Sequence, residues 1–486
     1  MMPRRGDPFD QMPPGSDQRR CPNGVPPRIG ILSCSVIPDD PRVRRQGDLL
    51  HEAGWSVVAI GLPGARSPAP AWRCLAIEPE PPPAPAAAPS DREVSSGLRV
   101  AAHRAVSRRT VGAQLGVLRQ AARLALLHPA VTSRMAKTLA RRVTGSAGVR
   151  LRDPLVRLLR LKTDRAFVDQ LYWGLNSKFQ ALCELGRAER VDLWLANDWT
   201  ALPIARRLAA EQGVPFAYDT HELAIEEYAE RPGWRWTQRP IIAAIEGDAI
   251  RAAGFVSCVS AGISGRLARF HRLRPPPLVV RNMPRYEALP FRPTPDRIEV
   301  LYHGVVSRGR GLEASIASVA FWRSDYFFTI RGPGDPDYLA HLAGLAAEHG
   351  VADRVIFAPA VPMIELVRAA ATADIGLLAL PGHSRQNVHA LPNKLFEYLM
   401  AGLALCITDL PEMAAIVRAH KAGELIPAVS PEAIAAAISR LDRPAIDACK
   451  RRALAAAREL NWENEGRGFL AACREAVRAS APATRR

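Results

Sequence analysis

The sequence lacks several features that would assign its class at once. Its eight cysteines are scattered over 486 residues, with no C-x-x-C pair and no histidine cluster at metal-ligand spacing. This pattern argues against structural zinc and indicates a reducing compartment. No apolar run reaches the roughly 18 residues that a membrane span needs, and residues 1–28 contain no apolar core of signal-peptide length. We therefore expect a cytoplasmic protein with no transmembrane helix, no metal and no tightly bound cofactor.

Positive charge is abundant but confined to one segment. The chain has 65 basic and 48 acidic residues, a formal charge of +17. Residues 98–165 hold 16 Lys or Arg against two acids, which is 14 of those 17 charges. Within them, residues 113–127 space leucines and arginines in a helical period, typical of an amphipathic cationic helix.

This basic segment has three interpretations. For a single helix of this kind, packing on its own domain with a solvated charged face is the most frequent outcome. The gathering of one sign of charge favours contact with an anionic membrane surface, which would make the protein peripheral at the inner membrane face. Nucleic acid also attracts clustered arginine, but we do not expect it as a partner because no recognition module accompanies the charge.

The rest of the chain alternates short apolar runs with helical patterns. The runs predict two groups of buried strands, at residues 28–36, 55–62, 191–198 and 255–260, and at residues 298–304, 373–380 and 403–410. Strands that alternate with helices form parallel sheets, so the pattern predicts two doubly wound, Rossmann-like α/β domains with a ligand cleft between them. The first unit lacks G-x-G-x-x-G, which disfavours a dehydrogenase.

The predicted domain boundaries follow this alternation. We expect a disordered leader at residues 1–27, a first domain at 28–290, a second at 296–460 after a proline-bearing linker, and a terminal helix and tail at 461–486. Within the first domain, residues 63–165 form an insertion whose first part, to residue 97, is rich in Pro and Ala and predicted to be an extended, flexible connection.

Two glycine-rich loops of the second domain suit a phosphate. "GVVSRGRG" follows a predicted strand and supplies Gly304, Arg308 and Arg310, which combine close backbone approach with forked hydrogen-bond donors. A flexible turn with exposed arginines explains this loop equally well when it is taken alone. "RGPG", which contains Gly332, is a second turn of lower specificity.

The segment "ALPNKLFEYLMAG", residues 390–402, predicts a helix start beside the carboxyl ends of the strands. Pro392 suits a first helical position, and the free N–H groups that follow can hold an anion. Lys394 can reach a phosphate from there. Asn393 and Glu397 share a helix face, and Glu397 could accept hydrogen bonds from ribose hydroxyls.

In the first domain, "YDTHELAIEE" puts His221 just past a strand, between Asp219 and Glu222. A lone histidine is usually structural. One at the carboxyl end of a parallel strand is nevertheless placed to contact a substrate.

At these residues the sequence resembles glycosyltransferase family four, the retaining group 1 glycosyltransferases of GT-B fold. The resemblance rests on the order and spacing of "DPRVRRQGDLLHEAGWSV", "YDTHEL", "YHGVVSRGRGLE", "DRVIFAPAV", "LPNKLFEYLMAG" and "NWENE". It implies a nucleotide-sugar donor held mainly by the C-terminal domain and a glycan or lipid-linked acceptor held by the N-terminal domain. It also implies independence of metal and a last helix that crosses back to the first domain.

Carried over by position, the resemblance assigns roles and reveals three departures. His221 matches the histidine that touches the donor sugar, and Glu397 matches the second glutamate of a pair, which binds ribose. The first glutamate falls on His389. The lysine of the diphosphate loop falls on Arg310 and its arginine on Val305, so the arginine role is vacant unless Arg308 takes it.

The resemblance thus implies His221, Arg310 and His389 as catalytic residues. On the acceptor side it implies Asp40, Arg42, Asp198 and Glu222. The function expected is sugar transfer in cell-surface polysaccharide or glycolipid synthesis. A sugar-nucleotide epimerase of similar fold and a non-catalytic relative are the alternatives.

Overall fold

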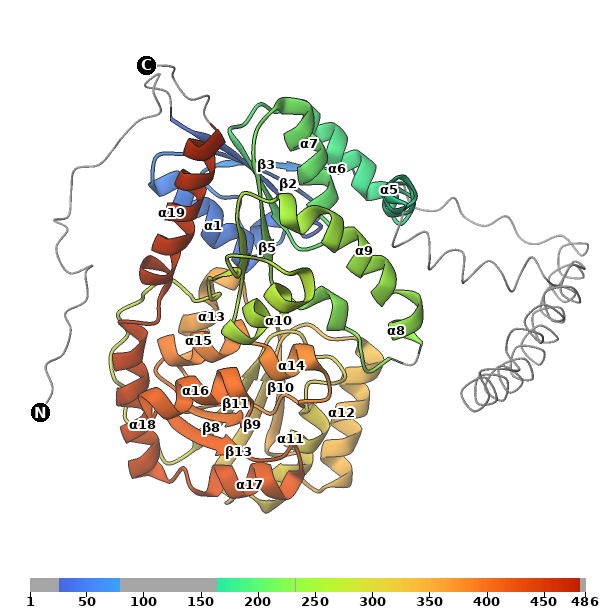
Figure 1. Cartoon of the computed structure of the whole chain (residues 1–486). Helices are drawn as coiled ribbons and strands as arrows, with labels where there is room; N and C mark the ends of the chain where they lie inside the picture. The colour runs from blue at the N-terminus through green and yellow to red at the C-terminus, as the bar shows by residue number, and fades with distance from the viewer. Residues whose placement is uncertain (1–25, 79–163, 232, 481–486) are drawn as a thin grey trace, which may run out of the picture. The chain divides into compact units, whose positions relative to one another are not determined.

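Figure 1 shows the computed structural model, which describes residues 26–78, 164–231 and 233–480. Within these residues the strands form two sheets, a seven-stranded one in the order β3-β2-β1-β4-β5-β6-β7 and a six-stranded one in the order β10-β9-β8-β11-β12-β13. Neighbouring strands run parallel in both, as the pairs of β1 with β2 and of β8 with β9 illustrate. The prediction of two doubly wound α/β domains is therefore confirmed. The predicted basic helical insertion lies almost wholly outside the described residues.

The first domain contains β1–β7 and the helices between them. Its elements are β1 (Arg28–Leu32), α1 (Pro41–Glu52), β2 (Ser56–Gly61), β3 (Arg73–Ala76), α5 (Arg165–Trp173), α6 (Ser177–Arg187), β4 (Leu193–Asn197), α7 (Leu202–Gln212), β5 (Phe216–Thr220), α8 (Trp234–Thr237), α9 (Arg239–Ala249), β6 (Val256–Cys258), α10 (Ala261–His271) and β7 (Leu278–Val279).

The second domain contains β8–β13. Its elements are β8 (Ile298–His303), α11 (Leu312–Ser318), β9 (Tyr326–Arg331), α12 (Pro336–Glu348), β10 (Val355–Ala358), α13 (Leu366–Ala370), β11 (Ile375–Leu378), α14 (Arg385–His389), α15 (Asn393–Met400), β12 (Ala404–Thr408), α16 (Pro411–His420), β13 (Gly423–Ile426), α17 (Pro431–Ser439) and α18 (Arg443–Ala457); α19 (Trp462–Ser480) follows.

The central strands are buried along their whole length because helices cover both faces of each sheet. All five residues of β4 and all five of β12 are buried. In the first sheet, Gly30 of β1 lies under the indole of Trp194 in β4, and a Cβ at Gly30 would come within 2.3 Å of that ring. The absence of a side chain in one strand therefore makes room for the largest side chain in the next.

The Pro- and Ala-rich stretch after residue 63 corrects one prediction. It was expected to be an extended connection, but Arg73–Ala76 form β3 and pair in parallel with β2. Trp72 fixes this strand, because its ring packs against Gly47 of α1 and its indole N–H donates to the Asp48 carboxylate at 2.8 Å. A short edge strand held by one buried aromatic residue lacks the periodic pattern that predicts strands.

The last helix, α19, packs on the first sheet, beside α1 (Figure 1). The Trp462 indole N–H donates to the Arg45 carbonyl at 2.9 Å, and Phe469 and Cys473 share a core with Ile29 and Leu193. The end of the chain thus completes the hydrophobic core of its first domain. Within the described ranges, no helix combines the length and apolar character that crossing a bilayer requires.

We predict that Phe469→Ala lowers the free energy of unfolding by about 3–5 kcal/mol, because it leaves a cavity in a closed core. Phe469 is 0% exposed. Chemical denaturation followed by circular dichroism measures the change. The control, Arg467→Ala on the exposed side of α19, should stay within about 0.5 kcal/mol of the parent. Equal effects of the two substitutions would contradict this account of the helix.

Candidate functional site

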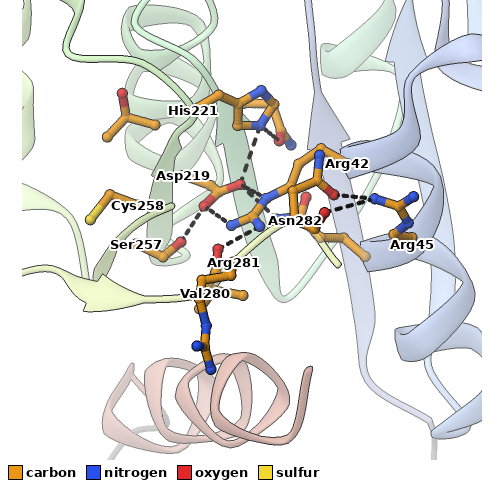
Figure 2. Close-up of polar contacts among 12 residues, drawn as sticks. Arg42, Arg45, Asp219, His221, Ser257, Cys258, Val280, Arg281 and Asn282 are labelled. Carbon is orange, nitrogen blue, oxygen red and sulfur yellow. Dashed lines mark hydrogen bonds and ion pairs between the residues drawn. The ribbon is translucent and has the colours of Figure 1, made fainter. Parts of the chain in front are cut away.

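The first half of the site is built around the buried carboxylate of Asp219 in β5 (Figure 2). Arg42 of α1 binds it with two hydrogen bonds, of 2.8 Å to Oδ2 and 2.7 Å to Oδ1. Gln46 donates to Oδ2 at 2.7 Å and the Ser257 hydroxyl to Oδ1 at 2.5 Å. Burial raises the pKa of Asp219, but the charge and hydrogen bonds of Arg42 outweigh it, so that this pKa lies well below its usual range.

Arg42 was predicted on the acceptor side, but its side chain does not reach solvent. It is 1% exposed, and its remaining terminal nitrogen donates to the Val280 carbonyl at 2.6 Å. With every nitrogen of the guanidinium directed at Asp219 or Val280, Arg42 joins α1 to β5 and to the segment after β7. In this structure the Arg42 guanidinium thus holds the Asp219 carboxylate in position.

His221 follows β5 and is held from both ring nitrogens. Nε2 lies 3.0 Å from Asn197 Oδ1 and 3.4 Å from Asp219 Oδ2, and Nδ1 lies 3.6 Å from Asp198 Oδ2. Burial lowers the pKa of His221, while the charges of Asp198 and Asp219 raise it, to about 9. The imidazole is therefore protonated at neutral pH and is oriented by the ends of β4 and β5.

Carboxylates surround this histidine. Asp198 has a φ of 65°, and its Oδ1 accepts the His221 backbone N–H at 3.1 Å. Burial and the charges of Asp198 and Glu227 raise the pKa of Glu222 to about 8, against the opposing charges of His221 and Arg310. Asp40 caps α1 and accepts the Ser35 hydroxyl at 2.6 Å. Of the predicted acceptor-side residues, Asp198 and Glu222 lie nearest to His221.

In the second domain, the two glycine-rich loops and the start of α15 meet at Gly304. A Cβ at Gly304 would come within 2.6 Å of Lys394 Nζ, and a Cβ at Gly332 would come within 2.0 Å of the Gly304 carbonyl oxygen. Gly304 and Gly332 also have positive φ angles, of 109° and 146°. Only glycine permits this close approach of backbone and lysine.

Positive charge gathers at this point without a carboxylate that fully neutralises it. Burial and the neighbouring charge of Arg310 lower the pKa of Lys394 to about 8, against the opposing effect of Glu397. α15 begins at Asn393, one residue later than predicted, and its N-cap, Pro392, offers no side-chain hydrogen bond. A helix start without a side-chain cap and the Lys394 ammonium therefore meet here, with the charge of Arg310 acting on that ammonium, which is an arrangement suited to phosphate.

Glu397 is engaged by protein groups on both carboxylate oxygens. His303 Nε2 lies 2.9 Å from Oε2, and the Arg45 guanidinium lies 3.8 Å from Oε1. Burial raises the pKa of Glu397, but the hydrogen bond and charge of His303, with Arg45 and Lys394, hold it below its usual range. A ribose bound here would share the carboxylate with His303.

The remaining predicted residues, Arg308 and His389, contact groups other than Lys394. The Arg308 guanidinium stacks over the Tyr338 ring at 4.8 Å, so it does not fill the vacancy left by Val305, which is 55% exposed. His389 lies against α10 of the first domain. Its Nδ1 is 3.8 Å from Glu412 Oε1, and its carbonyl accepts the Ser260 hydroxyl at 2.7 Å.

Sequence reasoning missed three residues of this site: Asn197, His303 and Arg45. Asn197 and His303 end their strands, immediately before Asp198 and Gly304, and this position at the carboxyl edge of a sheet was the signal that could have found them. Arg45 carries no such signal, because it lies within a helix. In the described residues, no group of three or more His, Cys, Asp or Glu side chains is placed to hold a metal ion.

Comparisons with known proteins point to one class of enzyme. Residues 297–443 match the family model described as "Glycosyl transferases group 1". A D-inositol 3-phosphate glycosyltransferase from Acidothermus cellulolyticus is 33% identical over 138 residues, which are 28% of this chain and 29% of that protein. The chain thus aligns with less than a third of the length of this relative.

Solved structures resemble the chain over most of its length. Sucrose-phosphate synthase from Thermosynechococcus elongatus superimposes with a TM-score of 0.60 at 15% identity, covering 93% of this chain and 100% of that one. HepE from Anabaena, solved with UDP and glucose, gives a TM-score of 0.58 at 10% identity, covering 92% and 99%. At these identities the likeness establishes the fold, which is GT-B.

We predict that Arg42→Met lowers the free energy of unfolding by about 3–5 kcal/mol, because it strands a buried carboxylate. The double variant Arg42→Met/Asp219→Asn should lose clearly less than the sum of the two single losses, since the uncompensated charge is gone. Urea denaturation of the four proteins measures this coupling. Additive losses would show that the pair does not act as a unit.

We predict that the ring of His221 titrates near pH 9 and that Asp198→Asn moves its midpoint toward the ordinary 6.5. The raised pKa means that the bound proton stabilises the folded state fully below pH 6.5 and that this contribution disappears as the pH rises through 9. NMR titration of the imidazole measures both midpoints. An unchanged midpoint in Asp198→Asn would exclude Asp198 as the cause.

Proposed function

We propose that this chain, whose residues 297–443 are a group 1 glycosyltransferase domain, transfers a sugar from a nucleotide-diphosphate donor to a glycan or lipid-linked acceptor. The observation that carries the proposal is that Lys394, at the uncapped start of α15, lies against Gly304, with the charge of Arg310 near enough to lower the pKa of Lys394. A diphosphate is the ligand that needs two cations, free N–H donors and a backbone without side chains at one point.

The proposed reaction places negative charge on the leaving nucleoside diphosphate. The bond between the anomeric carbon and the diphosphate oxygen breaks, the acceptor oxygen bonds to that carbon, and the proton of the acceptor hydroxyl passes to a phosphate oxygen of the nucleoside diphosphate, which leaves as an anion. Lys394 and Arg310 would lower the barrier because they stabilise negative charge as it develops on the leaving group. Since Lys394 has its pKa lowered to about 8, an arriving anion would also favour its protonated form.

The first domain would supply the acceptor side. The Nε2 of protonated His221 is held by Asn197, while Nδ1 lies 3.6 Å from Asp198 Oδ2, beyond hydrogen-bond distance, so that the Nδ1–H is suited to donate to a sugar oxygen. Asp198 and Glu222 are suited to accept hydrogen bonds from acceptor hydroxyls. We propose retention of anomeric configuration and no metal requirement, in keeping with the resemblance of the sequence to glycosyltransferase family four. The same resemblance supports a place in polysaccharide or glycolipid synthesis.

The donor class has support from the known structures. HepE, which shares the fold, was solved with UDP and glucose, and this supports a nucleotide-sugar donor here. The departures at Val305 and His389 leave the two cations of the proposed diphosphate site in place. A transferase that relies on Lys394 and Arg310 for leaving-group charge accounts for both departures.

We predict that Lys394→Ala lowers kcat/KM for the donor by about 10²–10³-fold, because it removes charge stabilisation at the leaving group. Arg308→Ala is the matched control and should change it by less than about threefold, since Arg308 stacks on Tyr338. Release of nucleoside diphosphate from a panel of UDP-, GDP- and ADP-sugars is the assay.

Three outcomes would count against the proposal. Equal activity of Lys394→Ala and the parent would show that Lys394 does not stabilise the diphosphate. Interconversion of the donor sugar without release of nucleoside diphosphate would indicate an epimerase. Binding of nucleotide sugars without turnover of any donor would favour the non-catalytic alternative.

A further inference from the structure

Arg45 of α1 is a buried arginine that takes no part in the reaction described above. Its Nη1 donates to the side-chain oxygen of Asn282 at 2.5 Å and to the backbone carbonyl of the same residue at 3.2 Å (Figure 2). Its Nη2 lies 3.8 Å from Oε1 of Glu397, in α15 of the second domain. One guanidinium therefore contacts both the segment that leaves the first domain and a helix of the second.

The segment that contains Asn282 is also bound by the start of α19. Glu465 accepts the Arg281 backbone N–H at 2.7 Å and the guanidinium of the same residue at 2.9 and 2.6 Å. The Trp462 backbone N–H donates to the Pro284 carbonyl at 2.9 Å. Both residues of α19 belong to "NWENE", a motif that the proposed function does not use. The Arg45 guanidinium is thus anchored to a segment that is itself fixed.

Glu397 has one carboxylate oxygen that Arg45 attracts without bonding to it. His303 Nε2 lies 2.9 Å from Oε2, whereas the 3.8 Å between Arg45 Nη2 and Oε1 is beyond hydrogen-bond distance. A hydroxyl of a bound ribose would therefore meet an oxygen that the guanidinium orients but does not occupy.

The charge of Glu397 depends on the groups that face it. Burial raises the pKa of this carboxyl, but the hydrogen bond and charge of His303, with the charges of Arg45 and Lys394, hold the pKa below its usual range. His303 ends β8 and Lys394 lies in α15, so both belong to the second domain. Of these three groups, Arg45 alone comes from the first domain. Burial lowers the pKa of Arg45 only to about 10, so its guanidinium is charged at neutral pH.

We propose that Arg45 is a positioning residue for the nucleotide donor, which holds the Glu397 carboxylate ionised and aligned for the donor's ribose. The inference rests on the proposed function, because it takes Glu397 to be the ribose-binding carboxylate, and it adds a dependence of donor affinity on the first domain. A nucleotide in the second domain binds tightly only while α1 supplies the charge beside Glu397. Arginine suits this place because its fork reaches Asn282 with one nitrogen and faces Glu397 with another.

Calorimetric titration of the full chain with UDP, GDP and ADP tests the proposal. The variants are Arg45→Met, Arg45→Gln and Arg45→Lys. For the diphosphate that the parent binds most tightly, Arg45→Met and Arg45→Gln should each raise Kd by at least about tenfold, because the charge beside Glu397 is lost. Arg45→Lys keeps the charge and should stay within about threefold of the parent.

Two further measurements separate positioning from a merely structural role. With the sugar donor that the parent turns over, Arg45→Gln should raise KM in proportion to Kd and change kcat by less than about threefold, since Arg45 acts on donor binding and not on the bond that breaks. In a Glu397→Gln background, Arg45→Met should weaken diphosphate binding by less than about threefold more, because the charged partner is already gone.

The matched control is Arg44→Met, one residue away in α1. Arg44 donates to the Pro68 carbonyl at 2.8 Å and is paired with Asp48, and both partners belong to the first domain. This variant should bind the diphosphates like the parent. Circular dichroism gives the unfolding midpoint of every variant. If Arg45→Met is unfolded at the assay temperature, the comparison of Arg45→Lys with Arg45→Gln decides.

Several results would overturn this assignment. Parent-like Kd values for Arg45→Met and Arg45→Gln would show that Arg45 does not act on the donor site, and donor turnover by the same proteins would leave the proposed function intact. Equal losses in Arg45→Gln and Arg45→Lys would reduce its role to anchoring Asn282. Additive losses with Glu397→Gln would show that Arg45 acts independently of that carboxylate. Absence of both diphosphate binding and donor turnover in the parent would instead overturn the proposed function, and this inference with it.

Discussion

The buried ion pair between Arg42 and Asp219 is the interaction on which the first domain depends. Taking two charges out of water costs several kcal/mol for each ion, and only excellent geometry with further hydrogen bonds offsets that cost. Both conditions hold, since Arg42 binds the carboxylate twice and Gln46 and Ser257 complete its shell. The Asp219 carboxylate of β5 thus joins four parts of the chain: α1, β5 itself, β6 and the segment after β7. His221, two residues further along the chain, takes its position from that arrangement.

In the second domain the site depends on two positions that must be glycine, Gly304 and Gly332. Lys394 can lie over Gly304, and Gly332 against the Gly304 carbonyl, only because neither glycine has a Cβ. The crowding has an electrostatic consequence, since Lys394 and Arg310 repel each other where burial already disfavours charge. A site in which two cations repel each other attracts a ligand that carries negative charge.

A line of charged side chains connects these two centres. His303 precedes Gly304 and holds Glu397 of α15, and Glu397 in turn faces Arg45 of α1. Arg45 also donates to the Asn282 side chain at 2.5 Å (Figure 2). Burial lowers the pKa of Arg45 to about 10, with the nearby charge of Glu397 opposing this shift. The carboxylate that the resemblance assigns to ribose is thus also the partner of an arginine one turn from Arg42.

The fold class, and the edge of each sheet where chemistry would lie, followed from the amino-acid pattern alone. Short apolar runs bounded by Gly, Pro or Asp indicate buried parallel strands whatever their partners, and residues just past such strands share one edge, as Asp198, His221 and Gly304 do. Only the tertiary structure decided the pairings. The partner of Arg42 lies 177 residues away, and β3 is held by Trp72 rather than by any periodic pattern. Such pairings depend on which helices and strands the fold brings together. The residues next to each partner in the sequence do not predict them.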